Sequence, residues 1–409
     1  MSTSQPVLFR SAAVLDPERG ELLPDRAVLV DGDRIAEVGG PELKHEDARI
    51  VDIGGMTLMP GLIDAHVHVT AVLADLGSLA EASPYYVAAR AGEVLRGMLG
   101  RGFTTVRDAG GADYGLAAAV DQGYFDGPRV VFGGKALSQT GGHADMRPRG
   151  RALLDQHVVS ASLGTVCDGV AEVRRAAREE LRRGAFHIKI MLSGGVASPT
   201  DRVDSTQFSV EEIRAAVEEA TAANRYVMGH AYTSRAINRG LECGVRSIEH
   251  GNLMDESSIP VFLSHQAFYV PTLVTYSALA EDGRAAGLPE DSYRKVFDVL
   301  DAGLRALELA DRAGVQIAFG TDLLGPMHAH QSREFTIRAQ VQPPDAIIRS
   351  ATTTAARLLN LEGQVGVVAP GAYADLLVVD GNPLEDIALL AAPEQHLKMI
   401  VKSGRFVAV

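Results

Sequence analysis

The stretch GLIDAHVHV (residues 61–69) decides how the rest of this chain is interpreted. Its apolar run is typical of a buried β-strand. His66 and His68 lie two residues apart, so their side chains point to the same face of that strand. Two imidazoles on one face can share a metal ion, although two ordinary histidines in a strand give the same pattern.

Short apolar segments like this one recur along the chain and alternate with helical stretches. One such helix is predicted over SVEEIRAAVEEATAAN (209–224), with Ser209 as its N-cap. The candidate strands are residues 61–69, 104–110, 129–137, 187–194, 226–232, 247–252, 268–274 and 316–323. Eight βα units predict an α/β fold, a (β/α)8 TIM barrel whose active site lies where the strands end.

A doubly wound open sheet is the competing α/β arrangement. It predicts a glycine-rich phosphate-binding loop after the first strand, whereas this first strand runs into His66 and His68. The barrel is therefore the favoured fold.

The two ends of the chain follow a different pattern from its middle. Residues 27–40 alternate apolar and polar side chains around Asp31-Gly32, which is typical of a tight hairpin. Residues 374–383 and 399–409 are also predicted to form β-strands, and the stretch 399–409 turns at Ser403-Gly404. We therefore expect a barrel over residues 61–362 and a β domain made from residues 1–60 and 363–409.

Composition excludes several classes of protein. The 409 residues are 46% hydrophobic and 22% charged, as in a globular enzyme-like chain. A formal net charge of -13 opposes binding to nucleic acid or to anionic lipid. No apolar run approaches the roughly 18 residues of a membrane helix. With only two cysteines, both expected to be free, and no recognisable signal peptide, we expect a cytoplasmic protein.

Further metal-ligand candidates stand at the ends of other predicted strands. His230 lies in the fifth segment, His250 in the sixth and Asp322 in the eighth. Each occupies the position at which a barrel exposes functional side chains.

Lys189 is unusual because it lies inside the apolar strand HIKIML. Burying a bare ammonium is costly unless its pKa falls or a partner is found. Carboxylation of the amine by carbon dioxide gives a carbamate that can bridge two divalent metal ions. The alternative is a lysine that reaches the barrel mouth or pairs with an acid.

Taken together, these residues resemble the amidohydrolase superfamily, in its binuclear subtype with a carboxylated lysine. MPGLIDAHVH (59–68) is similar to the first-strand signature, and PGAYADLLVVDGNP (370–383) to the C-terminal segment that joins N-terminal strands in a small β-sandwich. The resemblance implies that one metal ion is held by His66, His68 and Asp322, a second by His230 and His250, and that N6-carboxylysine at Lys189 bridges them. Zn is the usual metal, and Mn or Co suits the same ligands.

A narrower group within the superfamily is also similar to this chain. The matching stretches are TGGHADMRPRG (140–150), IKIMLSGGVASPTD (188–201), GHAYT (229–233) and TDLLGPMHAHQSREF (321–335). That group contains dipeptidases and carboxypeptidases of the Xaa-Pro and Xaa-Arg/Lys type and ochratoxinase-like amide hydrolases. It implies a small amide or dipeptide substrate, a metal-bridging hydroxide as nucleophile, Asp322 as general acid and base, and a homo-oligomer.

Two residues near the expected ligands are candidates for contact with the reacting carbonyl. His143 follows the third strand, and Tyr232 shares a strand face with His230, so either could donate a hydrogen bond to the developing oxyanion. A solvated histidine and a packed tyrosine are the alternatives. Arg147 and Arg149 are expected on the surface, although a guanidinium also suits a substrate carboxylate.

Three other histidines are assigned differently. His328 and His330 follow the eighth strand and are expected to form part of a substrate loop or a helix start. His187 shares the face of Lys189 and is expected in the core.

Several rival functions use the same fold. A deaminase of the superfamily has a Glu three residues after the fifth-strand histidine, where this chain has Thr233, and it would leave Lys189 without a role. An imidazolonepropionase acting on a ring amide, and a lactonase or phosphotriesterase on the same metal centre, stay open. Non-catalytic relatives lose metal ligands, whereas here all six positions are filled.

Overall fold

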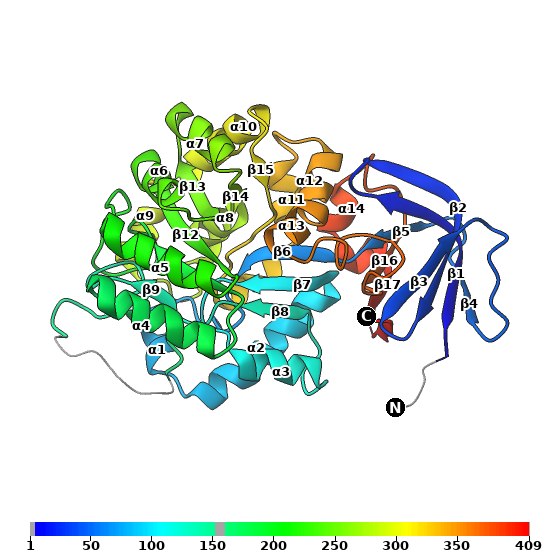
Figure 1. The fold of residues 1–409 in the computed structure, drawn as a ribbon, viewed down its shortest axis with the longest axis horizontal. Helices are drawn as coiled ribbons and strands as arrows, with labels where there is room; N and C mark the ends of the chain where they lie inside the picture. The colour runs from blue at the N-terminus through cyan, green and yellow to red at the C-terminus, as the bar shows by residue number, and fades with distance from the viewer. Residues whose placement is uncertain (1–4, 152–159, 409) are drawn as a thin grey trace.

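The computed structural model describes residues 5–151 and 160–408. Its larger part consists of parallel strands that alternate with helices, and its smaller part is a β-sheet beside both chain ends (Figure 1). The parallel strands form two sheets, in the orders β6-β7-β8 and β10-β9-β11-β12-β13-β14-β15. Their bounds are β6 Leu62–Val67, β7 Phe103–Asp108, β8 Arg129–Phe132, β9 Ala136–Ser138, β10 Gly164–Val166, β11 His187–Met191, β12 Tyr226–Thr233, β13 Ser247–Leu253, β14 Phe268–Val270 and β15 Gln316–Ile317. This arrangement is consistent with an amidohydrolase TIM barrel.

All eight predicted strand segments contain a strand, but several of the strands are shorter than predicted, and the third and eighth segments show why. The third is interrupted at Gly133-Gly134, where Gly134 has a φ of +73° and a Cβ on Gly133 would lie 2.6 Å from the His187 ring. The eighth ends at Ile317 because the following amides bond to different partners: Ala318 N to Tyr269 O and Phe319 N to Ser350 O.

Helices cover the parallel strands. The predicted helix at residues 209–224 is observed as α5, Val210–Ala222, and Ser209 and Glu212 form a capping box at its start. The others are α1 Leu76–Glu81, α2 Pro84–Gly100, α3 Tyr114–Asp121, α4 Gly169–Arg182, α6 Ser234–Glu242, α7 Ile259–Ser264, α8 Leu273–Asp282, α9 Glu290–Val296, α10 Gly303–Arg312, α11 Arg333–Arg338, α12 Pro344–Ser350, α13 Thr353–Leu358, α14 Ala388–Ala391 and α15 Pro393–His396, with 3-10 helices η1 Glu256–Ser258, η2 Leu300–Ala302 and η3 Gly325–His330.

Both ends of the chain contribute to one mixed β-sheet. Its order is β18-β17-β16-β5-β1-β2-β3, with β4 beside β1, and β5 pairs antiparallel with β16 to join the two ends. The bounds are β1 Val7–Asp16, β2 Glu21–Asp31, β3 Arg34–Gly39, β4 Arg49–Asp52, β5 Thr57–Pro60, β16 Leu376–Val379, β17 Leu397–Lys402 and β18 Arg405–Val407. Both predicted hairpin turns are confirmed, since β2 pairs with β3 and β17 with β18.

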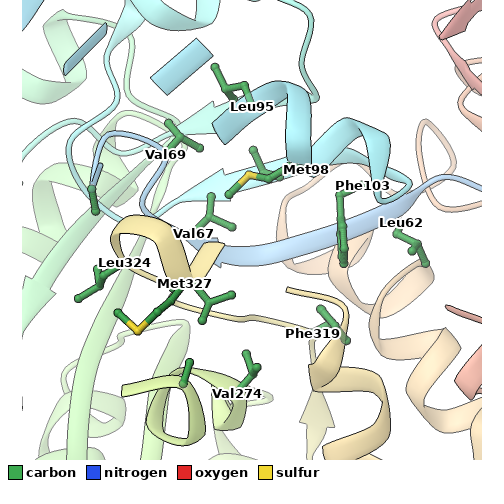
Figure 2. Close-up of a cluster of buried hydrophobic side chains, with 14 of the residues drawn as sticks. Leu62, Val67, Val69, Leu95, Met98, Phe103, Val274, Phe319, Leu324 and Met327 are labelled. Atoms are coloured by element: carbon green, nitrogen blue, oxygen red, sulfur yellow. The ribbon is translucent and has the colours of Figure 1, made fainter. Parts of the chain in front are cut away.

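The largest hydrophobic cluster joins the parallel strands to the terminal sheet. The rings of Phe103 and Phe319 lie 5.7 Å apart in this cluster, close to Leu62 (Figure 2). Leu377 and Leu397 of the terminal sheet belong to the same cluster. Burial of apolar surface therefore holds the two parts of the molecule together.

Two further expectations concern single features. Cys167 and Cys243 are both free and buried, as predicted. Within residues 5–151 and 160–408, no helix has the length and apolar character that crossing a membrane requires.

Candidate metal centre

His66, His68 and Asp322 come together at the carboxyl end of the parallel strands. One ligand atom from each of the three lies within 4.8 Å of the others. Asp322 Oδ1 is 3.4 Å from His66 Nε2 and 3.3 Å from His68 Nε2. Imidazole nitrogens and a carboxylate oxygen in this arrangement are suited to a divalent metal ion.

The backbone is strained at two of the predicted ligands. Asp322 has a φ of 54° and His250 a φ of 74°, in the left-handed region that non-glycine residues rarely adopt. The amides of Thr321 and Asp322 both donate to the carbonyl of His66, which ties the end of the eighth segment to the first strand. Such strain persists where surrounding contacts impose it, and it concentrates at functional sites.

His230 and His250 lie beside this group. Their ring centroids are 4.5 Å apart, and the His250 ring is 4.9 Å from the His66 ring. His250 Nδ1 is 3.8 Å from Asp322 Oδ2. The five predicted histidine and aspartate ligands therefore form one cluster of neighbouring side chains.

Hydrogen bonds to backbone carbonyls indicate which ring nitrogen of His68 and of His230 carries a proton. Nδ1 of His68 lies 2.8 Å from Gly110 O, and Nε2 of His230 lies 3.0 Å from Gly194 O. A carbonyl can only accept, so each of these nitrogens carries a proton, and in the neutral form of the ring the other nitrogen keeps its lone pair. Burial lowers the pKa of His230 and of His250 well below the ordinary value, which also keeps both rings neutral.

Lys189 is buried in β11, one strand away from His230. In the pairing of β11 with β12, Met191 lies opposite His230, so Lys189 is one step deeper on the same face. Burial lowers the pKa of Lys189 to about 8, although Glu249 and Asp322 act to raise it. Among the described residues its amine forms no salt bridge, since Glu249 pairs with Arg107 instead.

Glu249 and Arg107 lie behind His66 and were not among the residues predicted for the site. The fully buried Glu249 carboxylate lies 2.8 Å from His66 Nδ1 and accepts from Arg107 Nη2 at 2.9 Å. A carboxylate behind a ligating histidine fixes the ring and its tautomer. Both could have been noticed in the same way as Lys189, because Glu249 and Arg107 are charged residues inside predicted strands.

Asp64 is a third residue that the sequence analysis did not predict. Its carboxylate accepts from His66 N at 3.0 Å, from Thr321 Oγ1 at 2.6 Å and from Gln331 Nε2 at 2.9 Å. Burial raises the pKa of Asp64 to about 6, although these hydrogen bonds act to lower it. Asp64 thus holds the first strand against the residue that precedes Asp322.

His143 reaches the cluster, and its hydrogen bonds give it a particular tautomer. Its ring stacks on that of His230 at 4.2 Å, and its Nδ1 is 2.7 Å from Ser198 Oγ. The Ser198 hydroxyl donates to Asp201, so it accepts from His143 Nδ1–H. Burial lowers the pKa of His143 to about 4, so Nε2 of the neutral ring bears a lone pair. These contacts favour a hydrogen-bond acceptor at Nε2 over the donor that the sequence suggested.

Tyr232 lies next to the two histidines of the second predicted metal. Its ring centroid is 4.9 Å from that of His230 and 5.5 Å from that of His250. The Tyr276 hydroxyl donates to Tyr232 Oη at 3.0 Å, so the proton of Tyr232 is available for another acceptor. Burial raises the pKa of Tyr232, so it stays a protonated donor.

The remaining candidates lie outside the cluster. Arg147 donates to both carboxylate oxygens of Asp145, from Nε at 2.7 Å and from Nη2 at 2.6 Å. Arg149 is exposed. His328 and His330 both lie in η3. His328 bonds to Ala71 O, and His330 pairs with Asp282. His187 is buried and bonds to Asp108 O, which fits the expected core position.

A cavity of about 750 Å³ lies beside this end of the strands. It is lined by α1, β10 and α4, by the loops that follow β6, β9 and β11, and by the start of α9; its walls include Asp75, Ala144 and Ala197. None of the six predicted metal ligands is among its described lining residues. The cavity therefore adjoins the loop of His143 rather than the histidine cluster itself.

A buried polar atom tests whether the cluster fits a metal ion. His66 Nε2 is buried and makes no hydrogen bond to any described residue, although it faces Asp322. An unpartnered buried nitrogen is costly, and coordination to a cation removes that cost. The donor set and this atom together fit a divalent metal.

Comparison with known proteins places these features in a family. The sequence profile described as the amidohydrolase family matches residues 57–407. Ochratoxinase from Aspergillus niger is 33% identical over 400 residues, covering 94% of this chain and 83% of the relative.

Solved structures agree in fold with this chain. A prolidase in complex with N-methylphosphonate-L-proline is 51% identical, with a TM-score of 0.96 and coverage of 98% of this chain and 99% of the other. A Xaa-Pro dipeptidase with bound methionine is 30% identical, with a TM-score of 0.89 and coverage of 99% and 100%.

Proposed function

We propose that this chain, which belongs to the amidohydrolase family, cleaves the amide bond of a small substrate at a centre of two divalent metal ions. It is a hydrolase of that family, close to prolidases and ochratoxinase. The observation that carries the proposal is the cluster of His66, His68 and Asp322, with His230, His250 and Lys189 around it. Dipeptides, N-acyl amino acids and ochratoxin-like amides are the proposed substrates.

The ligands divide between two sites. His66, His68 and Asp322 would hold the first ion, and His230 and His250 the second, through the ring nitrogens that the protein leaves without a proton. When bound, the two ions supply an activated water and polarise the scissile carbonyl. Zn is the metal we propose, with Mn or Co as substitutes that suit the same nitrogen and oxygen ligands.

Lys189 would complete the centre as a carbamate. The neutral amine attacks carbon dioxide, a C–N bond forms, and one proton leaves, so the product is an anion with two oxygens. The lowered pKa of about 8 supports this reaction because it raises the fraction of neutral amine at physiological pH. The carbamate would also give the buried cluster a negative charge beside its cations.

Asp322 and Tyr232 would act on the reacting atoms. Asp322 faces His66 and His68 with the same oxygen, and its carboxylate would accept a proton from the attacking water and pass it to the departing nitrogen. Tyr232 would donate its proton to the carbonyl oxygen as negative charge develops there. His143 would accept a hydrogen bond from the substrate through Nε2.

We also propose that the parallel strands close into a barrel and that the terminal sheet forms a β-sandwich, with domain boundaries near residues 60 and 362. Ala65 N donates to Phe319 O at 2.7 Å, which connects the first and eighth segments. Phe186 N donates to Phe132 O at 2.9 Å and connects the third and fourth. These two contacts support closure across both gaps between the parallel sheets.

A substrate screen with metal analysis on the same sample tests the proposed function. Dipeptides, N-acyl amino acids, an imidazolone and a lactone are compared, and we expect amide turnover with about two metal ions per chain. Asp322→Asn should lower kcat at least 100-fold. The control is Asp204→Asn, which removes one charge from an exposed ion pair with Arg202 and should leave kcat unchanged. Turnover of the lactone alone, or a single metal ion per active chain, would contradict the proposal.

A further inference from the structure

Two buried hydroxyl groups, those of Thr272 and Tyr276, lie behind the proposed metal centre, and each is hydrogen-bonded to one residue of that centre. His250 Nδ1 lies 2.8 Å from Thr272 Oγ1. The Tyr276 hydroxyl donates to Tyr232 at 3.0 Å. The four residues come from β13, the segment after β14, α8 and β12.

The direction of the second bond follows from its donor, because Tyr276 has one proton and gives it to Tyr232. The direction of the first bond follows from metal coordination. When Nε2 of His250 holds a metal ion, Nδ1 carries the ring proton and donates it to Thr272 Oγ1.

Each hydroxyl leaves its partner in the state that the proposed function needs. With Nδ1 bonded to Thr272, the His250 ring can present a lone pair on Nε2 to a metal ion. Tyr232 accepts from Tyr276 and keeps its own proton for a further acceptor. Thr272 is fully buried and Tyr276 is 2% exposed, so water does not compete for either hydroxyl.

We propose that Thr272 and Tyr276 are positioning residues that present the Tyr232 proton to the substrate oxyanion and the His250 lone pair to the second metal ion. The proposal rests on the proposed function and extends it to residues that touch neither substrate nor metal. A hydroxyl that already accepts a hydrogen bond is a stronger donor, because neighbouring bonds in a chain polarise one another.

A double-mutant cycle on the metal-loaded enzyme tests the link between the two tyrosines. We expect Tyr276→Phe to lower kcat about 10-fold with KM changed less than twofold, because the lost polarisation matters in the transition state. In the Tyr232→Phe background the same substitution should cost less than twofold. Equal losses in both backgrounds would overturn the proposal, because a merely structural role is additive.

Tyr293→Phe is the matched control. It removes a tyrosine hydroxyl that donates to Ala280 O at 3.1 Å, a bond of similar length that does not involve Tyr232 or His250. We expect kcat within twofold of the parent. A loss as large as that of Tyr276→Phe would show that any missing tyrosine hydroxyl has this effect, and would overturn the proposal.

Two measurements without turnover separate this inference from the proposed function. Inorganic phosphate, whose oxygens resemble a tetrahedral oxyanion, should bind about fivefold more weakly to Tyr276→Phe than to the parent by calorimetry. Thr272→Val should lower affinity for the second metal ion at least 10-fold, and Thr272→Ser should restore it. Unchanged phosphate and metal affinities would overturn the inference even if amides are hydrolysed. A parent enzyme that cleaves no amide would overturn only the proposed function.

Discussion

Each histidine of the cluster commits one ring nitrogen to the protein. The partners are Glu249 for His66, Gly110 O for His68, Gly194 O for His230 and Thr272 for His250. The other nitrogen of each ring is then the one that can face a metal ion, so the site is organised before an ion arrives. At the scale of single residues, the protein itself therefore fixes the orientation of all four rings.

Lys189 gives the first prediction, on pH. With a pKa lowered by burial to about 8, its neutral fraction falls about tenfold per pH unit below 8 and is nearly constant above it. At fixed dissolved carbon dioxide, metal-stripped protein should regain activity at a rate that follows this fraction. To check this dependence, the rate of reactivation and the 13C signal of labelled carbamate are measured from pH 6 to 10.

The control for this measurement is Lys189→Met, which should show no carbamate signal from this position and no reactivation. An ordinary lysine, with a pKa near 10.5, would give a rate that keeps rising between pH 8 and 10. That profile would mean that the buried amine is not the group that takes up carbon dioxide.

Most of the candidate residues could be predicted from the sequence because they follow a short-range rule. His66 and His68 share a strand face, and His230, His250 and Asp322 each mark a strand end. Their partners could not be predicted in the same way. His66 and Glu249 are 183 positions apart, and only the folded chain brings them together.

At the scale of elements, the loop after β11 holds His143 in place. Lys295 of α9 donates to Gly195 O at 3.0 Å and to Ser198 O at 2.7 Å, which fixes this loop against the helix. The His143 ring packs directly on the backbone of Gly195, where an added Cβ would overlap the ring. The loop therefore acts as a platform for His143.

Gly195→Ala is the second prediction. The new methyl group must displace the His143 ring from its stack on His230, so we expect kcat/KM for an amide to fall about 10-fold or more. Overpacking should cost roughly 1–3 kcal/mol of stability. Steady-state kinetics and urea unfolding measure the two effects.

Gly100→Ala, at the end of α2, is the matched control because its Cβ would meet no atom within 4 Å. It should leave kcat/KM unchanged and stability equal or slightly higher, by about 0.5–1 kcal/mol. If Gly195→Ala behaved like this control, His143 would not depend on the loop for its position.

Element boundaries show where local rules stop. Ser209 was predicted as an N-cap, and it caps α5, because capping depends on residues within one turn. The eighth strand was predicted to reach residue 323 but ends at Ile317, because Ala318 and Phe319 bond to distant segments. Hydrophobic runs indicate burial, and they do not reveal which backbone partner each amide will find.

At the scale of the whole molecule, the terminal sheet is fastened to the parallel strands by charge as well as by apolar contact. Arg129 of β8 pairs with Asp375, just before β16, at 2.7 Å. Asp375 also accepts from Ser403 N at 2.7 Å, and its side chain is 2% exposed. The pair thus links the parallel strands to two C-terminal segments.

Asp375→Asn is the third prediction, and it separates stability from catalysis. The substitution keeps the shape of the side chain but leaves the Arg129 cation, whose side chain is 18% exposed, without its counter-charge. We expect a loss of roughly 2–4 kcal/mol in the free energy of unfolding by urea, with kcat unchanged because neither residue is in the metal cluster. Glu290→Gln, in a pair with Arg284 whose side chains are 54% and 62% exposed, should cost less than about 0.5 kcal/mol. Equal small losses in both variants would mean that apolar packing alone holds the terminal sheet in place.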